Sequence, residues 1–547
     1  MIRSGVPCRG WLAPGMLAAV GALALGLSAG LSAARAQAAE PERATGDPVL
    51  IWNDQTNRAI QETSTDPFQA SRALALESIA VLDTVRSIAS APAFLVRLPG
   101  ARDLKPDIAA AAAAHAMLSQ LFPARRPALD ATLAASLANE PAGPARDRAV
   151  AFGKAVADAV FARRADDGWN AAANGATSGA ANGATNGATG GAPPGEWRPT
   201  PPDFAPPQDP QWGAMTPFVM TKPSQFRPAG PPALGSAAFR EAAASVAALG
   251  AAQSADRTAA QTDIARFWSD GAGTYGPAGH WNAITASLVP SAGLSLEAEA
   301  ELFAELNVAI ADAAIAVADA KYNYRFWRPV TAIREGAAGA PPNPDWSPLL
   351  ETPNHPSYIS GHSSFSGAAA TVLTARFGPR EFSFAGASAP GMTRDFTSFQ
   401  QAAEEAAMSR EYGGIHYAFD NADGLATGRA VGAWTLAAFR RIAAEDRGPA
   451  IVMDHPGQPR TQAPAGFALD NFSPVKTVTV RVDGGQRFNV AVDDRGRFAL
   501  PPLHPGQFGQ MQAVLVATSA TGHTATARLV FDGAADGNMV TAPFTVQ

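Results

Sequence analysis

Basic residues and histidines form three short clusters within about a hundred residues of this 547-residue chain. The first cluster holds Lys321 and Arg328, which are seven positions apart. On one continuous helix, seven positions make two turns, so the two cations would share a face. Like charges on one face repel each other unless an anion lies between them, which predicts an anion site. A solvated basic face beside aromatic residues is the alternative.

The second cluster is a turn with the sequence Ser360-Gly361-His362. The apolar run from Phe365 to Phe377 predicts a helix directly after it. A helix N-terminus presents unpaired N–H groups and the positive end of its dipole, and oxyanions bind there. Ser360 can add a hydroxyl donor, and His362 can act as a general acid or base.

The third cluster runs from Arg410 through His416 to Asp420. Arg410 is a third cation, with donors that suit bidentate binding of an oxyanion. If the chain is helical from His416, the imidazole and the Asp420 carboxylate are one turn apart. The carboxylate could then hold the tautomer that leaves Nε2 free to attack phosphorus or bind a metal. An ordinary ion pair on a helix surface has the same spacing.

Together the clusters predict a pocket for a tetrahedral oxyanion, vanadate or phosphate. Their order, Lys-x6-Arg-Pro, then Ser-Gly-His, then Ser-Arg-x5-His-x3-Asp, resembles the superfamily of type 2 phosphatidic acid phosphatases and vanadium-dependent haloperoxidases. The match is dense over residues 321–420. Residues 195–202 and 267–271 also resemble the soluble bacterial haloperoxidases. We expect the resemblance to extend over about residues 47–445.

The resemblance implies which residues bind the oxyanion. Lys321, Arg328 and Arg410 would neutralise its equatorial oxygens. Ser360 and the N–H group of Gly361 would donate hydrogen bonds to the same oxygens.

The resemblance also implies the residues that carry the chemistry. His416 would be the apical ligand of vanadium, or the nucleophile that becomes phosphorylated in a phosphatase. His362 would be the acid–base partner on the opposite side, and Asp420 would orient His416. Asp270 is expected to interact with one of the arginines without contacting the oxyanion itself.

Two further positions bear on the sub-family. His355 lies where the resemblance implies a Phe in fungal chloroperoxidases and a His in algal bromoperoxidases, and a loop or capping histidine is the alternative. Ala318 lies where the fungal enzymes carry a Trp. Both departures argue against chloride oxidation. The other histidines follow no ligand spacing and are expected to be structural or exposed: His115, His280, His455, His504 and His523.

The resemblance therefore implies an exported haloperoxidase that oxidises halide with hydrogen peroxide at a bound vanadate, without haem or flavin. The alternative is an acid phosphatase that hydrolyses a phosphate ester through a phosphohistidine, because the transition state of phosphoryl transfer resembles bound vanadate. A non-catalytic binding protein is a third possibility, but His362 and His416 argue against it. The net charge of −6, with no Lys/Arg-rich run, gives no indication of nucleic-acid binding. Neither the oligomeric state nor the organic substrate is predicted.

The elements that position these residues are predicted to be mainly α-helical. Apolar residues make up 47% of the chain and charged residues 16%, which is enough for a large core. Apolar residues recur every three or four positions over 71–82, 108–121 and 146–161, and again from about 237 to 445. Ser295 is the predicted N-cap of a helix that starts at Leu296. Pro329 should kink or end that helix. We expect a helical-bundle body of the haloperoxidase and acid-phosphatase kind.

Composition divides the chain further. Residues 1–36 have a basic start, an apolar stretch and a small-residue site at Ala34-Arg35-Ala36, which predicts a cleaved signal peptide and a periplasmic or secreted protein. An uncleaved membrane anchor is the alternative. No later segment is apolar for long enough to cross a membrane. The single cysteine, Cys8, lies inside this signal, so no disulfide is expected in the mature protein.

The remaining boundaries follow from repeats and periodicity. We expect an N-terminal helical part over residues 37–169, a flexible insert over 170–195 with three Asn-Gly-Ala-Thr repeats, and the oxyanion-binding domain over 196–450. Residues 465–547 are predicted to form a small antiparallel β domain, because apolar and polar residues alternate over 475–482, 487–492, 513–517 and 525–531. Its strands are consistent with an immunoglobulin-like sandwich.

Overall fold

The computed structural model describes residues 46–99, 102–171, 192–336 and 340–444, and the segments containing strands β3–β12 between residues 450 and 546. The predicted signal peptide, residues 1–36, lies outside the described residues, as does most of the predicted insert, residues 172–191. Among the described residues, no helix combines the length and apolar character that a membrane span requires.

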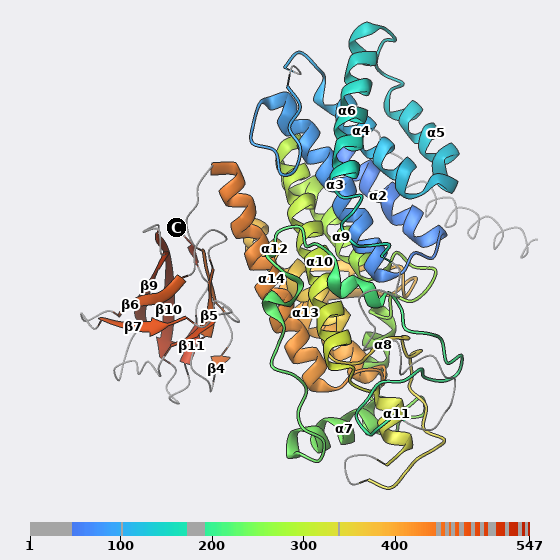
Figure 1. Ribbon diagram of the computed structural model, residues 1–547, viewed down its shortest axis with the longest axis vertical. Helices are drawn as coiled ribbons and strands as arrows, with labels where there is room; N and C mark the ends of the chain where they lie inside the picture. Colours follow the sequence, from blue (N-terminus) through green and yellow to red (C-terminus); the bar gives the residue numbers. More distant parts are fainter. Residues whose placement is uncertain are drawn as a thin grey trace, which may run out of the picture. The chain divides into compact units, whose positions relative to one another are not determined.

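The body is built mainly from α-helices (Figure 1). Those before residue 170 are α2 (Pro48–Glu62), α3 (Pro67–Ala89), α4 (Pro106–Leu121), α5 (Arg126–Ser136) and α6 (Pro144–Arg163). Those after it are α7 (Ala237–Leu249), α8 (Ala259–Phe267), α9 (Gly276–Leu288), α10 (Leu296–Tyr324), α11 (Pro329–Arg334), α12 (Gly361–Phe377), α13 (Phe399–Tyr412) and α14 (Ala418–Ala444). Single 3-10 turns are η1 (Pro123–Arg125), η2 (Pro210–Ala214), η3 (Pro223–Phe226) and η4 (Val289–Ser291).

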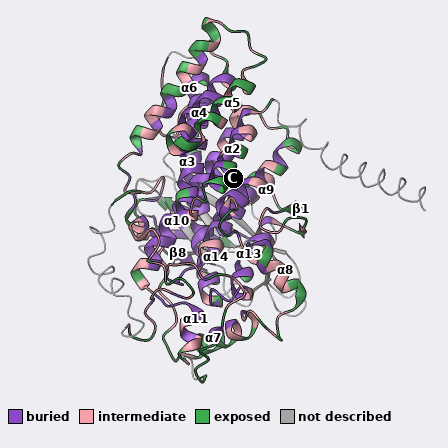
Figure 2. Ribbon diagram, turned by 90° about the vertical axis from the view of Figure 1, so that its right-hand side faces the viewer, coloured by how far each residue is buried: buried purple, intermediate pink, exposed green. Residues whose placement is uncertain are grey.

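Helix α10 is the central element of the body. It packs against α3, α12 and α14 (Figure 1), and its residues from Leu302 to Lys321 are buried on every side. Ser295 caps its N-terminus by accepting a hydrogen bond from the N–H group of Ala298, as predicted. A helix that is buried all round needs small residues where its neighbours approach, and the many alanines of α10 supply them. In Figure 2 the buried residues follow α3, α10, α13 and α14 through the interior.

The mainly α-helical fold predicted from the sequence is confirmed. One detail of that prediction is wrong. Helix α10 ends at Tyr324, because Arg325 adopts a left-handed conformation with φ of 49°, and Pro329 begins α11 instead of kinking a continuing helix. Lys321 and Arg328 therefore do not share one helical face. They approach the same region from two different helices.

Helices α12 and α14 pack with their backbones in close contact. A Cβ atom added at Gly428 of α14 would lie 2.0 Å from the carbonyl oxygen of Ser364 on α12. Gly424 and Gly432 lie one turn to either side, and a Cβ atom there would lie 2.8 and 2.7 Å from carbonyl oxygens of the same region. This stripe of glycines sets the distance between the turn before α12 and the loop before α14. Those two segments carry the second and third clusters of the sequence.

Two features of the body were not anticipated. Strands β1 (Phe382–Ala385) and β2 (Thr393–Phe396) form an antiparallel hairpin between α12 and α13. In the proline-rich segment before α7, Trp197 and Trp212 are buried, whereas Phe204 is 51% exposed.

The C-terminal strands are β3 (Ala450–Met453), β4 (Pro459–Arg460), β5 (Ala465–Leu469), β6 (Val475–Val482), β7 (Arg487–Ala491), β8 (Arg497–Ala499), β9 (Gln510–Ser519), β10 (Thr524–Gly533), β11 (Met539–Thr541) and β12 (Thr545–Val546). Their described pairings are all antiparallel, in a sheet of order β4-β11-β10-β9-β6-β7, with β12 beside β10, and a second sheet of order β3-β5-β8. Val478 and Leu515 of the first sheet share an apolar cluster with Ala468 and Phe498 of the second. The predicted antiparallel β region is confirmed, whereas its immunoglobulin-like topology remains a prediction.

Candidate active site

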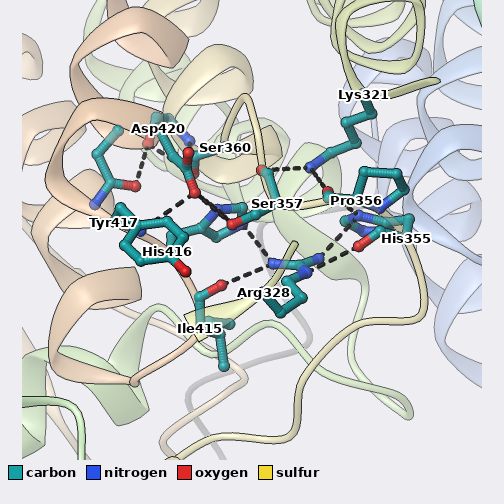
Figure 3. Close-up of polar contacts among 12 residues, drawn as sticks. Lys321, Arg328, His355, Pro356, Ser357, Ser360, Ile415, His416, Tyr417 and Asp420 are labelled. Atoms are coloured by element: carbon teal, nitrogen blue, oxygen red, sulfur yellow. Dashed lines mark hydrogen bonds and ion pairs between the residues drawn. The ribbon is translucent and has the colours of Figure 1, made fainter. Parts of the chain in front are cut away.

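Lys321 lies in the last turn of α10 and is fully buried. Its Nζ donates hydrogen bonds to the carbonyl oxygens of Pro356 at 2.7 Å and Ser357 at 3.0 Å (Figure 3). Both acceptors belong to the turn that leads into α12. This turn therefore links the first cluster of the sequence to the second.

Arg328, the residue before α11, is also fully buried. Its Nε donates to the carbonyl oxygen of His355 at 2.8 Å, and its Nη2 lies 2.9 Å from Nδ1 of the same residue. Its Nη1 donates to the carbonyl oxygen of Ile415 at 2.8 Å and lies 3.1 Å from Nε2 of His416 (Figure 3). Because a guanidinium can only donate, Nε2 of His416 is the acceptor and the imidazole proton resides on Nδ1.

His416 and Asp420 form the pair that their spacing predicted. Nδ1 of His416 lies 2.9 Å from Oδ2 of Asp420, and the same oxygen accepts from the hydroxyl of Ser357 and from the N–H group of Tyr417. The local structure differs from the prediction, because α14 begins only at Ala418. The turn before the helix, rather than a helical turn, brings the imidazole to the carboxylate.

Arg410 occupies the last turn of α13 and is buried. Its Nη1 donates to the carbonyl oxygen of Trp268 at 2.8 Å. Its Nε is buried and has no hydrogen-bond partner among the described residues.

His362 lies in the first turn of α12, with its side chain 14% exposed. Its Nε2 lies 3.7 Å from Oδ2 of Asp270, and neither atom has a hydrogen-bond partner within the described part of the chain. Oδ1 of Asp270 accepts from the hydroxyl of Ser388 at 2.6 Å and lies 2.9 Å from Nδ1 of His280.

The predicted support of an arginine by Asp270 takes the form of an electrostatic effect on Arg410. Asp270 lies between two histidines, and its negative charge acts on Arg410 without a hydrogen bond between them in the described structure. His280, predicted to be structural or exposed, is fully buried and stacks on Trp268 at 4.4 Å between ring centroids. No spacing pattern could have identified His280, because the loop between α8 and α9 brings it to Asp270.

Ser360 and Gly361 form the N-terminus of α12 as predicted. The Ser360 hydroxyl oxygen accepts from the N–H and hydroxyl groups of Ser363, which leaves its own proton free to donate. A Cβ atom at Gly361 would meet nothing within 4 Å except Cγ1 of Val317 at 3.9 Å. The space beside this N–H group is open, as an oxyanion site at a helix N-terminus requires.

His355 contacts the site directly through its two hydrogen bonds with Arg328. Its ring lies 6.2 Å from the ring of Phe68 on α3. His355 therefore belongs to the wall of the site and is not a solvent-exposed loop residue.

Three buried cations converge here without matching anions. Burial lowers the pKa of Lys321 well below its ordinary value, and the charge of Arg328 lowers it further. Burial also lowers the pKa of Arg328 to about 9 and that of Arg410 to about 10. Among the described residues, no carboxylate forms an ion pair with any of the three. A bound anion would compensate this buried positive charge.

The histidines are held neutral by the same environment. Burial and the charges of Arg328 and Lys321 lower the pKa of His416 well below 6.5. Burial and Arg410 lower the pKa of His362, and Asp270 opposes that shift. A neutral His416 with its proton on Nδ1 has its lone pair on Nε2, and this lone pair accepts the hydrogen bond from Nη1 of Arg328. The same tautomer attacks phosphorus or binds a metal when that hydrogen bond is exchanged for the ligand.

The two carboxylates differ in their ionisation. Burial raises the pKa of Asp420 to about 6, and the hydrogen bond from Ser357 opposes this increase. Burial also acts to raise the pKa of Asp270, but the charge and hydrogen bond of His280 outweigh burial and lower it to about 2. Asp270 is therefore the more firmly ionised of the two.

The residues present fit a tetrahedral oxyanion. The fit rests on the open space at Gly361, the unpaired Nε of Arg410 and the cations that lack ion-pair partners. Vanadate and phosphate share the shape and the charge that this arrangement suits.

Comparisons with known proteins agree with this geometry. A family model described as the second helical-bundle domain of VCPO matches residues 301–445, which include all three clusters. A vanadium chloroperoxidase of Curvularia inaequalis is 27% identical over 411 residues, covering 60% of this chain. The match spans 65% of that relative, just under two thirds of its length.

Solved structures show the same relationship. The first bacterial vanadium-dependent iodoperoxidase matches with a TM-score of 0.61 and 28% identity, over 73% of this chain and 97% of that one. A bacterial vanadium-dependent chloroperoxidase in its holo form matches with a TM-score of 0.53 and 18% identity, over 69% and 93% of the two chains. The second match is evidence for the fold alone.

Proposed function

Since the chain belongs to the superfamily of vanadium-dependent haloperoxidases and type 2 phosphatidic acid phosphatases, we propose that it is an exported vanadium-dependent haloperoxidase that oxidises halide with hydrogen peroxide. The observation that carries the proposal is the group of three buried cations, which have no ion-pair partner among the described residues, around the unprotonated Nε2 of His416. The haloperoxidase names of the relatives support it. Export is proposed from the signal sequence alone.

In this proposal the chain's residues hold vanadate as the cofactor. Lys321, Arg328 and Arg410 would bind the equatorial oxygens, and Ser360 and the Gly361 N–H would donate to them. Nε2 of His416 would be the apical ligand. When bound, vanadate would supply a Lewis acid that activates hydrogen peroxide toward attack by halide.

His362 would transfer the proton that peroxide activation requires. Its imidazole is neutral before the reaction because burial and Arg410 lower its pKa. After it accepts a proton, Oδ2 of Asp270, 3.7 Å from Nε2, would stabilise the charged ring. His280 would hold Asp270 in place from the other side.

Iodide and bromide are the proposed halides, in preference to chloride. His355 and Ala318 differ from the residues that the resemblance implies for fungal chloroperoxidases, and Ala318 is fully buried beside the site. The iodoperoxidase, at 28% identity, lends further support. Chloride is the hardest of the three halides to oxidise, so a site that departs from the chloroperoxidase pattern should lose it first.

One pair of assays tests the proposal. The protein is purified, loaded with orthovanadate and assayed for bromination of a phenolic dye with peroxide, alongside hydrolysis of a phosphate monoester. Bromination that requires vanadate is the expected result. Hydrolysis that vanadate inhibits, with no bromination, would overturn the proposal in favour of the acid phosphatase. Inactivity in both assays would favour a non-catalytic binding protein.

A further inference from the structure

Ser357 makes hydrogen bonds to residues of the first and third clusters and lies three residues before Ser360 of the second cluster. Its N–H group donates to the carbonyl oxygen of Phe326 at 2.8 Å, and its own carbonyl oxygen accepts from Nζ of Lys321 at 3.0 Å. Its hydroxyl donates to Oδ2 of Asp420. The residue is fully buried, and Figure 3 shows it between Lys321 on one side and His416 and Asp420 on the other.

The carboxylate of Asp420 is held at one oxygen only. Oδ2 accepts from Nδ1 of His416 at 2.9 Å, from the N–H group of Tyr417 at 3.2 Å and from Ser357, whereas Oδ1 has no hydrogen-bond partner among the described residues. Two of these three donors come from the loop that Asp420 itself follows. The hydroxyl of Ser357 is the donor that ties the carboxylate to the rest of the site.

We propose that Ser357 is a positioning residue, whose hydroxyl keeps the Asp420 carboxylate on Nδ1–H of His416 so that Nε2 remains the unprotonated atom facing the oxyanion. The inference rests on the oxyanion site proposed above. If the carboxylate turns away, the imidazole proton can move to Nε2. A proton on Nε2 opposes the Nη1 donor of Arg328, 3.1 Å away, and blocks the lone pair that would bind vanadium or phosphorus.

The variant Ser357→Ala isolates this contact. It removes the hydroxyl but keeps the backbone bonds to Phe326 and Lys321. Ser71→Ala is the matched control, because Ser71 is a buried serine on α3 whose hydroxyl donates to the carbonyl oxygen of Phe68. Ser357→Cys retains a weak donor of similar size and should show a partial effect.

The first measurement needs no cofactor. Nitrogen-15 NMR of the full chain with labelled histidine reports the tautomer of His416, whose signals are identified by their loss in His416→Ala. Wild type and Ser71→Ala should show the proton on Nδ1. Ser357→Ala should show a mixture of the two tautomers. Ser357→Cys should show a smaller fraction of the Nε2-protonated tautomer than Ser357→Ala.

The second measurement is the affinity for orthovanadate by calorimetry. Loss of a group that orients a metal-binding histidine typically weakens metal binding about 10-fold to 100-fold. We therefore expect Ser357→Ala to lose vanadate affinity by a factor in that range, and Ser71→Ala to bind vanadate like wild type. Should Ser357→Ala fail to fold, Ser357→Cys carries both measurements. The proposal is overturned if the Ser357 variant that folds keeps the wild-type tautomer, or binds vanadate as tightly as Ser71→Ala. An enzyme that binds vanadate in this pattern but oxidises no halide would contradict the proposed function and leave the role of Ser357 intact.

Discussion

In the proposed haloperoxidase and in the alternative phosphatase, the chemistry would depend on His416. Its neutral ring arises from burial and from the cations Arg328 and Lys321, which lower its pKa. Its orientation arises from Asp420 on one nitrogen and Arg328 on the other. The surrounding charges thus prepare an imidazole that offers one specific lone pair.

Replacing His416 by alanine should abolish vanadate-dependent bromination, because its Nε2 is the proposed apical ligand of vanadate. The matched control is His115→Ala. His115 also pairs with an aspartate, Asp130, at 2.7 Å, but on α4 and away from the clusters. Bromination rates of both variants, measured with saturating orthovanadate, check the prediction. A His416→Ala enzyme that kept wild-type activity would show that the apical assignment is wrong.

Gly361 offers a test of the open space beside the N-terminus of α12. A methyl group there would meet only Val317 at an ordinary contact distance of 3.9 Å, and alanine is favoured over glycine within a helix by up to about 1 kcal/mol. We therefore expect Gly361→Ala to fold as stably as wild type, or more so. Its affinity for orthovanadate should fall at least about 10-fold, because the methyl group takes the place of an oxyanion oxygen.

Chemical denaturation measures the stability of Gly361→Ala, and titration with orthovanadate measures its affinity. Unchanged vanadate affinity would place the oxyanion elsewhere.

At the scale of elements, the site depends on how closely α12 and α14 approach each other. Ser360 caps α12, which begins with Gly361 and His362. His416 lies in the turn before α14, and Asp420 lies in the first turn of that helix. The glycines of α14 allow its backbone to lie directly on α12. The N–H group of Ser360 donates to the carbonyl oxygen of Asp420 at 3.0 Å, which fixes the two starting points together.

Gly428→Ala should therefore destabilise the protein and impair the site. The added Cβ would lie 2.0 Å from the carbonyl oxygen of Ser364, so backbone must move. Overpacking of this kind costs about 1–3 kcal/mol or more, which exceeds the gain of about 1 kcal/mol in helix propensity.

Gly432→Ala provides the graded comparison, since its Cβ would lie 2.7 Å from the carbonyl oxygen of Ala368, one turn farther from the site. Urea unfolding should rank Gly428→Ala below Gly432→Ala and both below wild type. The reverse ranking would contradict this account of the packing.

At the scale of the whole molecule, a buried acid in the core makes stability depend on pH. Glu77 lies on α3 and is buried, and burial raises its pKa from 4.5 to about 8. The folded protein therefore keeps this proton up to about pH 8, whereas the unfolded chain releases it near pH 4.5. Between these values the folded state binds more protons, so the free energy of unfolding decreases as the pH rises.

Glu77→Gln should remove this dependence. Between pH 5 and pH 8 the free energy of unfolding of the wild type should decrease by on the order of 4 kcal/mol more than that of Glu77→Gln. Above about pH 8 the variant should be the more stable protein. Urea unfolding at pH 5, 7 and 9 measures the difference, with Glu62→Gln, at a partly exposed glutamate on α2, as the control. Parallel curves for wild type and Glu77→Gln would show that Glu77 is ionised in the folded state.

Much of this organisation could be predicted from the order of residues. Apolar spacing located α3, α4, α6, α10 and α12, and strand alternation located β6 and β7, because amphipathic periods are local properties of the chain. The motif spacing identified Lys321, Arg328, Arg410, His362 and His416 as residues that should meet. Their convergence confirms the superfamily resemblance at the level of the fold.

The spacing of residues along the chain could not predict the contacts that depend on the turns between helices. The left-handed Arg325 separates Lys321 from Arg328, so a prediction of one helical face was wrong although the two residues still meet. Ser357 and His280 carry no ligand spacing, and only packing brings their side chains to Asp420 and Asp270. The sequence by itself thus determined which chemical groups are present and which helices carry them. The tertiary structure decided the partners of each group, because hydrogen bonds across the site join residues far apart along the chain.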